Sequence, residues 1–358
     1  PSPDIIRNNL AFSQRNGSWG SLIEIPDAAH VSSPVLALTH DESKETPAVV
    51  VYQSLVVAGD PADKTRNQFF TGQDIRWRYF DGSTWQAEQS LTSDALYDAE
   101  PVIAFNSTGS GVTAWMHNTE DTPINGGGEF DRSANEIQVA AWDQTSHAWT
   151  AVETLTSDMV SDSKPAVFAD DAGTLYVVWL RDTPTGNEIM YSTNSGSGWS
   201  VPSALDIAGL PEGGKVGNVA IGSEGPGRVD VLLTHSRRFQ DNSVESRLYN
   251  RPSTIAEFAS PTALEIVAED ANFSHLKTVS AADDGALVAY WQQGDGVTNE
   301  IFASRIGPTG TGSSAWSAPI RLTSGEVLEF DPSVAVDTDG TYQVVYEMTL
   351  APVLAAPS

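Results

Sequence analysis

Two short units alternate along this chain, and the order in which they occur limits the possible folds more than any other feature of the sequence. The first unit is an apolar run, a turn rich in Asp, Gly and Asn, and a second apolar run, as in PAVFADDAGTLYVVWLRD from Pro165. Residues that tolerate positive φ in such a turn predict a β-hairpin. Six copies of this hairpin begin at Pro34, Pro101, Pro165, Asn218, Leu276 and Pro332.

A second unit follows five of the six hairpins, and its sixth copy lies at the other end of the chain. The hairpin at Pro332 has no second unit after it, whereas the segment from Asp4 to Ile25 has no hairpin before it. Consecutive hairpins start 67, 64, 53, 58 and 56 residues apart, and wrapping from Pro332 through Ser358 to Pro34 adds a matching 60. The two chain ends therefore complete one another if the chain closes on itself, which predicts six blades around one axis.

The sequence thus predicts an all-β, six-bladed β-propeller with four-stranded antiparallel blades, because no window sustains the period of an amphipathic helix. A single domain is expected over residues 1–350. Its sixth blade is shared by residues 1–28 and 331–350, so that N-terminal outer strands pair with the C-terminal hairpin. Residues 351–358 belong to the Ala- and Pro-rich tail TLAPVLAAPS and are expected to be a linker stub.

Charge and cysteine content exclude several partners and sites. The formal net charge is −28, and a field of this sign repels nucleic-acid phosphates and anionic lipid head groups. The chain has no cysteine, which excludes disulfides, thiolate metal sites and cysteine nucleophiles. No apolar run approaches the ~18 residues of a membrane span. We therefore expect no nucleic-acid partner and no membrane insertion.

The chain ends suggest a larger protein. The first residues, PSPDIIRNNL, carry neither a signal peptide nor an initiator Met, and the last residues have linker composition. We expect the chain to be one module of a multidomain protein that is exported or displayed on a bacterial cell surface.

One turn carries a family resemblance. The segment STNSGSGW, from Ser192 to Trp199, resembles the Asp-box of sialidase-like six-bladed propellers, Ser-x-Asp-x-Gly-x-x-Trp, with Asn194 at the Asp position. The resemblance implies a structural turn on the face away from the active site. The sialidase catalytic pattern is absent, because no Arg-Ile-Pro segment occurs. In addition, the adjacent Tyr346 and Glu347 point to opposite faces of a strand. Sialidase activity is therefore not expected.

Acidic residues are predicted at the start of every third strand. They could form a crown that binds a cation or performs acid–base chemistry. Alternatively, each acid pairs within its own blade, as cross-strand pairs do. Sixfold recurrence favours pairing, because scaffolds repeat and catalysis breaks symmetry. The six acids are Asp4, Asp74, Glu136, Glu188, Glu245 and Glu300.

The asymmetric residues are better candidates for ligand binding. The ends of the second strands carry His117, Arg181 and His235, and Arg237 and Arg238 follow. With Glu188 opposite Arg181, they form a predicted cationic patch for an acidic sugar or a peptide carboxylate. The alternative is that these side chains are solvated or paired with nearby acids. Trp115, Trp179 and Trp291 are expected to pack between blades rather than to stack on sugars.

No cofactor is required by the sequence, and calcium is the one metal it suggests. The insert EDTPINGGGEFD combines carboxylates with a flexible loop, and an ordinary solvated loop is the alternative. The candidate ligands are Glu120, Asp121, Glu129 and Asp131.

Two functions follow from these observations. The first is a non-catalytic propeller module that binds a polysaccharide or a protein through the loops of its top face. The alternative is a polysaccharide-active enzyme, a glycoside hydrolase or a polysaccharide lyase, with its site around His117, Arg181 and His235.

Overall fold

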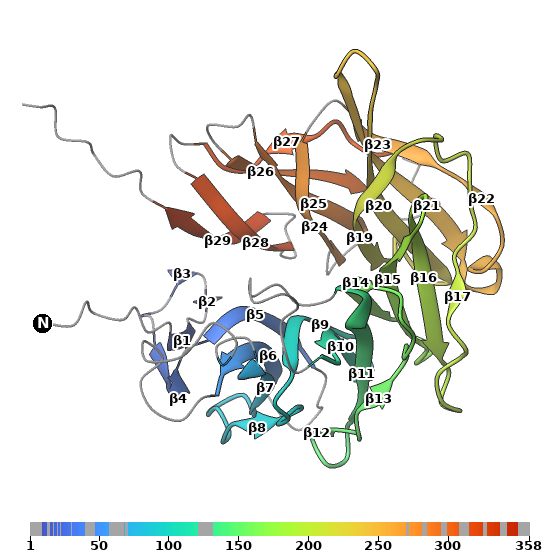
Figure 1. The fold of residues 1–358 in the computed structure, drawn as a ribbon. Helices are drawn as coiled ribbons and strands as arrows, with labels where there is room; N and C mark the ends of the chain where they lie inside the picture. Colours follow the sequence, from blue (N-terminus) through green and yellow to red (C-terminus); the bar gives the residue numbers. More distant parts are fainter. Residues whose placement is uncertain are drawn as a thin grey trace, which may run out of the picture. The chain divides into compact units, whose positions relative to one another are not determined.

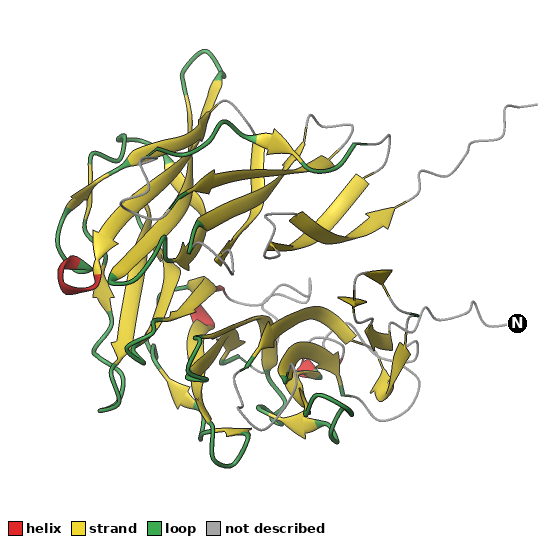
Figure 2. Ribbon diagram, turned by 180° about the vertical axis from the view of Figure 1, so that it is seen from behind, coloured by secondary structure: helices red, strands yellow, loops and turns green. Residues whose placement is uncertain are grey.

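The computed structural model is built from strands (Figures 1 and 2). Its helical elements with defined bounds are two short 3-10 helices, η2 (Arg132–Ala134) and η3 (Ile255–Glu257), and Gln68 and Thr71 are also helical. No helix in the described part of the chain is long and apolar enough to cross a membrane. The structure describes residues 9–12, 15–16, 18–19, 21, 23–29, 31–39, 47–56, 68, 71–120, 132–269, 272–280, 285–294, 299–307, 315–324, 328–336 and 342–349.

Several predicted features lie outside the described residues. They are Asp4 of the acidic crown, three of the four calcium candidates and the linker stub at residues 351–358. The three calcium candidates are Asp121, Glu129 and Asp131. These expectations stay predictions.

The chain divides into two compact units. Unit 1 comprises residues 1–182 and 191–203, and unit 2 comprises residues 183–190 and 204–358.

Unit 1 begins with two strand pairs and continues with sheets of the predicted kind. β1 (Asn9–Phe12) pairs with β4 (Ile23–Ala29), and β2 (Arg15–Asn16) pairs with β3 (Ser18–Trp19). The next sheet has the order β5 (Val31–Leu38), β6 (Ala48–Leu55), β7 (Gln73–Phe80), β8 (Gln89–Ser90). It is followed by a sheet of β9 (Tyr97–Phe105), β10 (Gly111–Asn118) and β11 (Asn135–Asp143), with β12 (Ala148–Trp149) and β13 (Glu153–Thr154) paired to β11.

The boundary between the units falls inside the third sheet. Its order is β14 (Asp162–Ala169), β15 (Leu175–Thr183), β16 (Gly186–Asn194), β17 (Ser203–Ala204).

Unit 2 continues the pattern. One sheet has the order β19 (Lys215–Gly222), β20 (Arg228–Arg238), β21 (Val244–Thr254), β23 (Glu265–Glu269), and β18 (Ile207–Ala208) pairs with β22 (Thr262–Ala263). The last sheet contains β24 (Asn272–Ser280), β25 (Leu287–Gly294), β26 (Asn299–Ile306) and β27 (Ile320–Arg321). The hairpin of β28 (Leu328–Val336) and β29 (Tyr342–Thr349) is connected to β26 through the single pair Asn299–Leu328.

All six predicted hairpins are antiparallel strand pairs in the structure. Among the described residues, five sheets have at least four strands each, and the chain has the all-β propeller fold. Six blades and closure through the chain ends remain predictions.

The apolar core follows the second strands, as the sequence predicts. Trp115, Trp179 and Trp291 are fully buried at equivalent positions. Trp115 lies in one cluster with Val49 and Trp77 of the preceding sheet, and Trp291 lies in one cluster with Leu232. These contacts agree with packing between blades.

The turn that resembles an Asp-box has a structural role. Asn194 Oδ1 accepts hydrogen bonds from Gly196 N at 2.8 Å and Gly198 N at 3.3 Å, and Asn194 pairs with Trp199. Both glycines have positive φ, 96° and 101°, which the absence of a Cβ permits. Asp81 closes a similar turn through Ser83 N and Thr84 N, both at 2.9 Å.

Candidate functional site

Unit 1 contains two polar clusters built from one repeated segment. LTSDALYDAEP from Leu91 and LTSDMVSDSKP from Leu155 start 64 residues apart. The same offset relates Trp115 to Trp179 and His117 to Arg181. We define the His117 cluster as Asp74, Asp94, Asp98 and His117. The Arg181 cluster is Glu136, Asp158, Asp162 and Arg181.

Three segments bring each cluster together. The segment before the first strand is fixed to the preceding sheet, because Ile75 N donates to Thr92 Oγ1 at 2.9 Å. A bulge at Glu100, with φ 57°, then interrupts the pairing of β9 with β10. The second repeat has the same parts, with Ile137 N donating to Thr156 Oγ1 at 2.9 Å and Lys164 at φ 53°.

A fully buried aspartate is the centre of the His117 cluster. Asp98 Oδ1 accepts a hydrogen bond from Trp115 Nε1 at 3.1 Å and lies 2.8 Å from His117 Nδ1. Asp98 Oδ2 has no hydrogen-bond partner among the described residues. Burial raises the pKa of Asp98, which His117 partly offsets.

The pKa of His117 reflects opposing effects. Burial lowers this pKa, but the hydrogen bond that the imidazole donates to Asp98 and the charges of Asp98, Asp94 and Glu136 outweigh burial and raise the pKa above its usual value. The imidazole therefore keeps its proton more readily than an exposed histidine.

The Arg181 cluster holds a permanent cation in the equivalent place. Arg181 Nε donates to Asp162 Oδ1 at 2.9 Å, and its Nη2 lies 2.6 Å from Asp162 Oδ2 and 3.1 Å from Asp158 Oδ2. Trp179 Nε1 also donates to Asp162 Oδ1, at 2.8 Å. Both oxygens of this buried carboxylate are thus satisfied, and these hydrogen bonds raise the pKa of Arg181 further.

Each cluster includes an acid from the third strand of the preceding sheet. Burial raises the pKa of Glu136 to about 7, and the charges of Asp162 and Asp158 add to the effect. Burial raises the pKa of Asp74 to about 6, although Arg76 Nη2 lies 2.7 Å from Asp74 Oδ2. Asp74 Oδ1 and Glu136 Oε2 are buried and have no hydrogen-bond partner in the described part of the chain.

His235 and Arg237 in unit 2 both contact neighbouring residues closely: His235 packs against Gly214, and Arg237 forms an ion pair with Glu245. His235 is buried, and burial followed by the charge of Arg237 lowers its pKa. A Cβ on Gly214 would lie 2.1 Å from His235 Nε2, so this close approach requires glycine. Arg237 Nη2 lies 2.6 Å from Glu245 Oε2, and its guanidinium lies 4.6 Å from the centre of the Phe239 ring.

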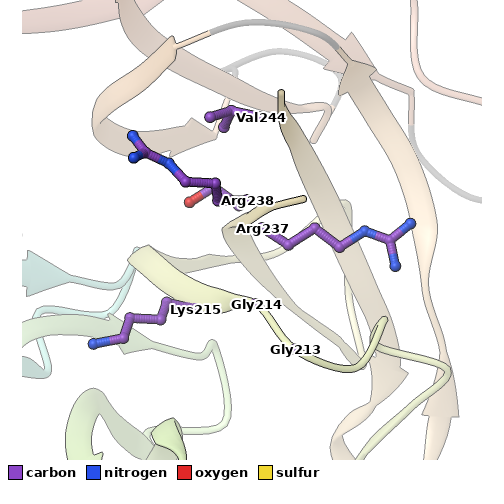
Figure 3. A pocket seen from close by; sticks show the side chains of 7 residues that line it. Gly213, Gly214, Lys215, Arg237, Arg238 and Val244 are labelled. Carbon is purple, nitrogen blue, oxygen red and sulfur yellow. The ribbon is translucent and has the colours of Figure 1, made fainter. Parts of the chain in front are cut away.

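A pocket of about 350 Å³ opens beside these residues (Figure 3). Lys215 and Arg238 are exposed on it, and neither has a hydrogen-bond or ion-pair partner among the residues that the structure describes. The side chains of Arg237 and Arg238 point in opposite directions in Figure 3. The guanidinium of Arg237 lies on Glu245, away from that of Arg238. The lining residues are Gly213, Gly214, Lys215, Ser236, Arg237, Arg238 and Val244.

The predicted cationic patch is distributed over both units. His117 and Arg181 belong to unit 1, whereas His235, Arg237, Arg238 and the exposed Glu188 belong to unit 2. One joint patch therefore stays a prediction. Glu120, the described member of the calcium set, is half-buried next to Asn118, whose Oδ1 accepts a hydrogen bond from Glu120 N at 3.0 Å.

The sequence aligns the acids at the starts of the third strands with the ends of the second strands, and the strand register tests this prediction. The predicted strand ends are Ser54, His117, Arg181, His235, Gln293 and Met348. Asp74 faces Ser54, Glu136 faces His117 and Glu300 faces Gln293, as predicted. The prediction was wrong for the sheet that contains β20. There, His235 faces Arg247 and Glu245 faces Arg237, because β20 and β21 are 11 residues long and extend beyond the predicted ends.

Sequence reasoning missed Asp94, Asp98, Asp158 and Asp162. The positions that face the other second-strand ends are Val31, Val216, Phe273 and Glu329, so aspartate occurs there only in these two of the described hairpins. The repeated LTSD segment was the signal that could have revealed them. Two triplets of ligand atoms, from Asp94, Asp98 and His117 and from Glu136, Asp158 and Asp162, each lie within 4.8 Å of one another.

Comparison with known proteins places the fold but no family. No family model matches the sequence, and no curated protein matches it. An ulvan lyase from a new polysaccharide lyase family is similar in structure, with a TM-score of 0.55, 10% identity and coverage of 84% of this chain and 74% of that chain. The α-L-arabinofuranosidase Arb93A from Fusarium graminearum is similar in structure with a TM-score of 0.52 and 13% identity, and the match covers 89% of this chain and 93% of that chain.

A sialidase is also similar in fold. The NanB sialidase of Streptococcus pneumoniae gives a TM-score of 0.53 and 9% identity, with coverage of 88% of this chain and 65% of that chain. At these identities the likeness concerns the fold alone.

Proposed function

We propose that this chain is a non-catalytic propeller module that binds an acidic polysaccharide through the pocket of unit 2, as part of a larger exported or cell-surface bacterial protein. We further propose that the propeller has six blades and belongs to the sialidase-like superfamily. The even spacing of the hairpins and the turn at Asn194 support these two points.

The observation that carries the binding proposal is the pair Lys215 and Arg238. The chain has a net charge of −28, and described arginines such as Arg181 and Arg237 form ion pairs with acids. The exposed Lys215 and Arg238 line a pocket and have no such partner among the described residues. A guanidinium and an ammonium bind carboxylate or sulfate groups well. Exposed Phe239 and Val244 lie close along the chain and offer apolar contact for a sugar ring.

Affinity electrophoresis on anionic and neutral polysaccharides tests this proposal. We expect retardation by polyuronates or sulfated glycans that weakens with salt, and about tenfold weaker binding for Arg238→Ala. Arg132→Ala removes an exposed cation from unit 1 and serves as the matched control. Equal binding of both variants, or binding that prefers neutral glycans, would contradict the proposal.

A polysaccharide-active enzyme is the second candidate, and one observation favours it. Glu136, with a pKa of about 7, faces His117 across β10 and β11, and His117 is held by Asp98. A protonated carboxyl beside an imidazole is a combination suited to proton transfer. The structural neighbours are named as a polysaccharide lyase, an arabinofuranosidase and a sialidase, and these names support a carbohydrate substrate for the enzyme candidate.

Release of new reducing or unsaturated ends from anionic polysaccharides distinguishes the two candidates. If the chain is an enzyme, Glu136→Gln should lower turnover by about 10²–10⁴-fold while binding through Arg238 persists. Binding without any turnover by the unmodified chain would leave the binding module as the function.

A further inference from the structure

The central Asp98 of the His117 cluster is paired with a histidine where Asp162 of the next repeat is paired with an arginine, and the guanidinium of Arg76 binds Asp74 instead. In the Arg181 cluster, one guanidinium uses both oxygens of Asp162 and also binds Asp158. In the His117 cluster, Asp98 Oδ1 takes the hydrogen bonds of Trp115 and His117, and Oδ2 is buried with no hydrogen-bond partner among the described residues. A buried carboxylate oxygen without a partner is costly, and a bound ion is one explanation for it.

The remaining groups are placed to hold such an ion. Ligand atoms of Asp94, Asp98 and His117 lie within 4.8 Å of one another. Asp94 is exposed, so the cluster is open to solvent on that side. Asp74 contributes a second unpartnered oxygen. Its side chain is more than nine-tenths buried, and its Oδ1 has no hydrogen-bond partner in the described part of the chain. The charges of Asp98 and Asp94 also act on this carboxyl group.

We propose that the His117 cluster binds a divalent cation, Mn²⁺ or Zn²⁺, through Asp94, Asp98 and His117, in the place that the Arg181 guanidinium takes in the next repeat. Carboxylate oxygens together with an imidazole nitrogen are a donor set for these ions. The binding proposal for the pocket of unit 2 does not require this cation, whereas the enzyme candidate uses the same His117 and Asp98.

Thermal unfolding of the full chain with increasing Mn²⁺ or Zn²⁺, after treatment with a chelator, tests the site, and Mg²⁺ controls for ionic strength. At a metal concentration of 100 times Kd, we expect the Tm to rise by about 4 °C. Electron paramagnetic resonance of Mn²⁺ gives the stoichiometry, which we expect to include one site that depends on this cluster.

Matched variants in the two repeats locate the ion. Asp94→Asn preserves the turn in which Oδ1 accepts a hydrogen bond from Leu96 N at 3.1 Å, and it should weaken binding at least tenfold. Asp158→Asn preserves the equivalent turn, with Val160 N at 3.1 Å, and should leave the affinity unchanged. His117→Arg installs the cation of the other repeat and should abolish the response.

Three results would overturn the proposal. One is the absence of any shift with both ions in the unmodified chain. Another is a cation affinity of Asp94→Asn equal to that of the unmodified chain. Asp94 is exposed, so this variant should fold normally. The third is a loss of affinity in Asp158→Asn as large as that in Asp94→Asn, which would assign the ion to the Arg181 cluster.

Discussion

The His117 and Arg181 clusters have the same scaffold but differ at two positions, His117 against Arg181 and Asp74 against Glu136. Both have an aspartate at the start of the first strand, a tryptophan that donates to it and an exposed aspartate in the preceding turn. The second strand ends in histidine in one cluster and in arginine in the other. The shared residues are therefore structural, and the residue at the end of the second strand decides whether the buried first-strand aspartate is paired with a permanent cation.

The two clusters also differ in how far their central buried aspartate is satisfied by neighbouring side chains. In the Arg181 cluster both oxygens of the central Asp162 are satisfied by Arg181, and only Oε2 of Glu136 is buried without a partner among the described residues. The His117 cluster leaves carboxylate oxygens of Asp74 and Asp98 without partners among the described residues. Incomplete buried polar networks are where a ligand can contribute most.

The largest effect is expected from the central aspartate of each cluster. Asp162→Asn removes the charge that holds Arg181 at 2.6 Å and should lower the free energy of unfolding by about 3–5 kcal/mol. Asp98→Asn should cost only about 1–2 kcal/mol, because it has no fixed cation to abandon. Urea denaturation at pH 7 measures both, and equal costs would contradict the difference between the clusters.

The tryptophans test what the clusters share. Trp115→Phe and Trp179→Phe each remove a donor to a buried carboxylate and leave a small cavity, so each should cost about 2–3 kcal/mol. Trp291→Phe is the matched control, because Trp291 Nε1 donates to the neutral Gln293 Oε1 at 3.2 Å. In chemical denaturation, Trp291→Phe should lower the free energy of unfolding less than the other two substitutions. An equal loss would show that the hydrogen bonds to the aspartates do not add to stability.

Glu136 makes the Arg181 cluster sensitive to pH. Its pKa rises from 4.5 to about 7 in the fold, so the folded state binds more protons than the unfolded state in this window. The free energy of unfolding should therefore fall as pH rises from about 4.5 to 7. Glu136→Gln removes this part of the slope and should gain ~2 kcal/mol relative to the unmodified chain at pH 8. Denaturation curves at pH 5 and 8 check this, and an unchanged difference between the two pH values would contradict it.

The sequence predicted the hairpins well because turn residues and apolar runs are local signals. The buried run from Ala48 to Leu55 and the turn at Asn194 needed no tertiary information. Register was harder, since the length of β20 and β21 moved Glu245 opposite Arg237 instead of His235.

The site was only half predicted, for a physical reason. His117 and Arg181 stood out as rare cations in an acidic chain, and the sequence placed both at equivalent strand ends. Their partners Asp98 and Asp162 looked like ordinary strand starts, because acids are common in this chain and the bulges that direct them depend on the paired strand. Only the comparison of one repeat with the next identifies them.

The smallest effect is expected at the exposed aspartates, and it should differ between the clusters. Asp158→Asn removes a half-exposed partner of Arg181 and should cost about 0.5–1 kcal/mol, less at high salt. Asp94→Asn removes a charge that disfavours ionisation of Asp74 and Asp98, so in the presence of a chelator stability should not fall. Thermal unfolding of both variants at low and high salt measures the pair. A cost for Asp94→Asn equal to that for Asp158→Asn would mean that His117 acts as a permanent cation, and the distinction between the two clusters would then disappear.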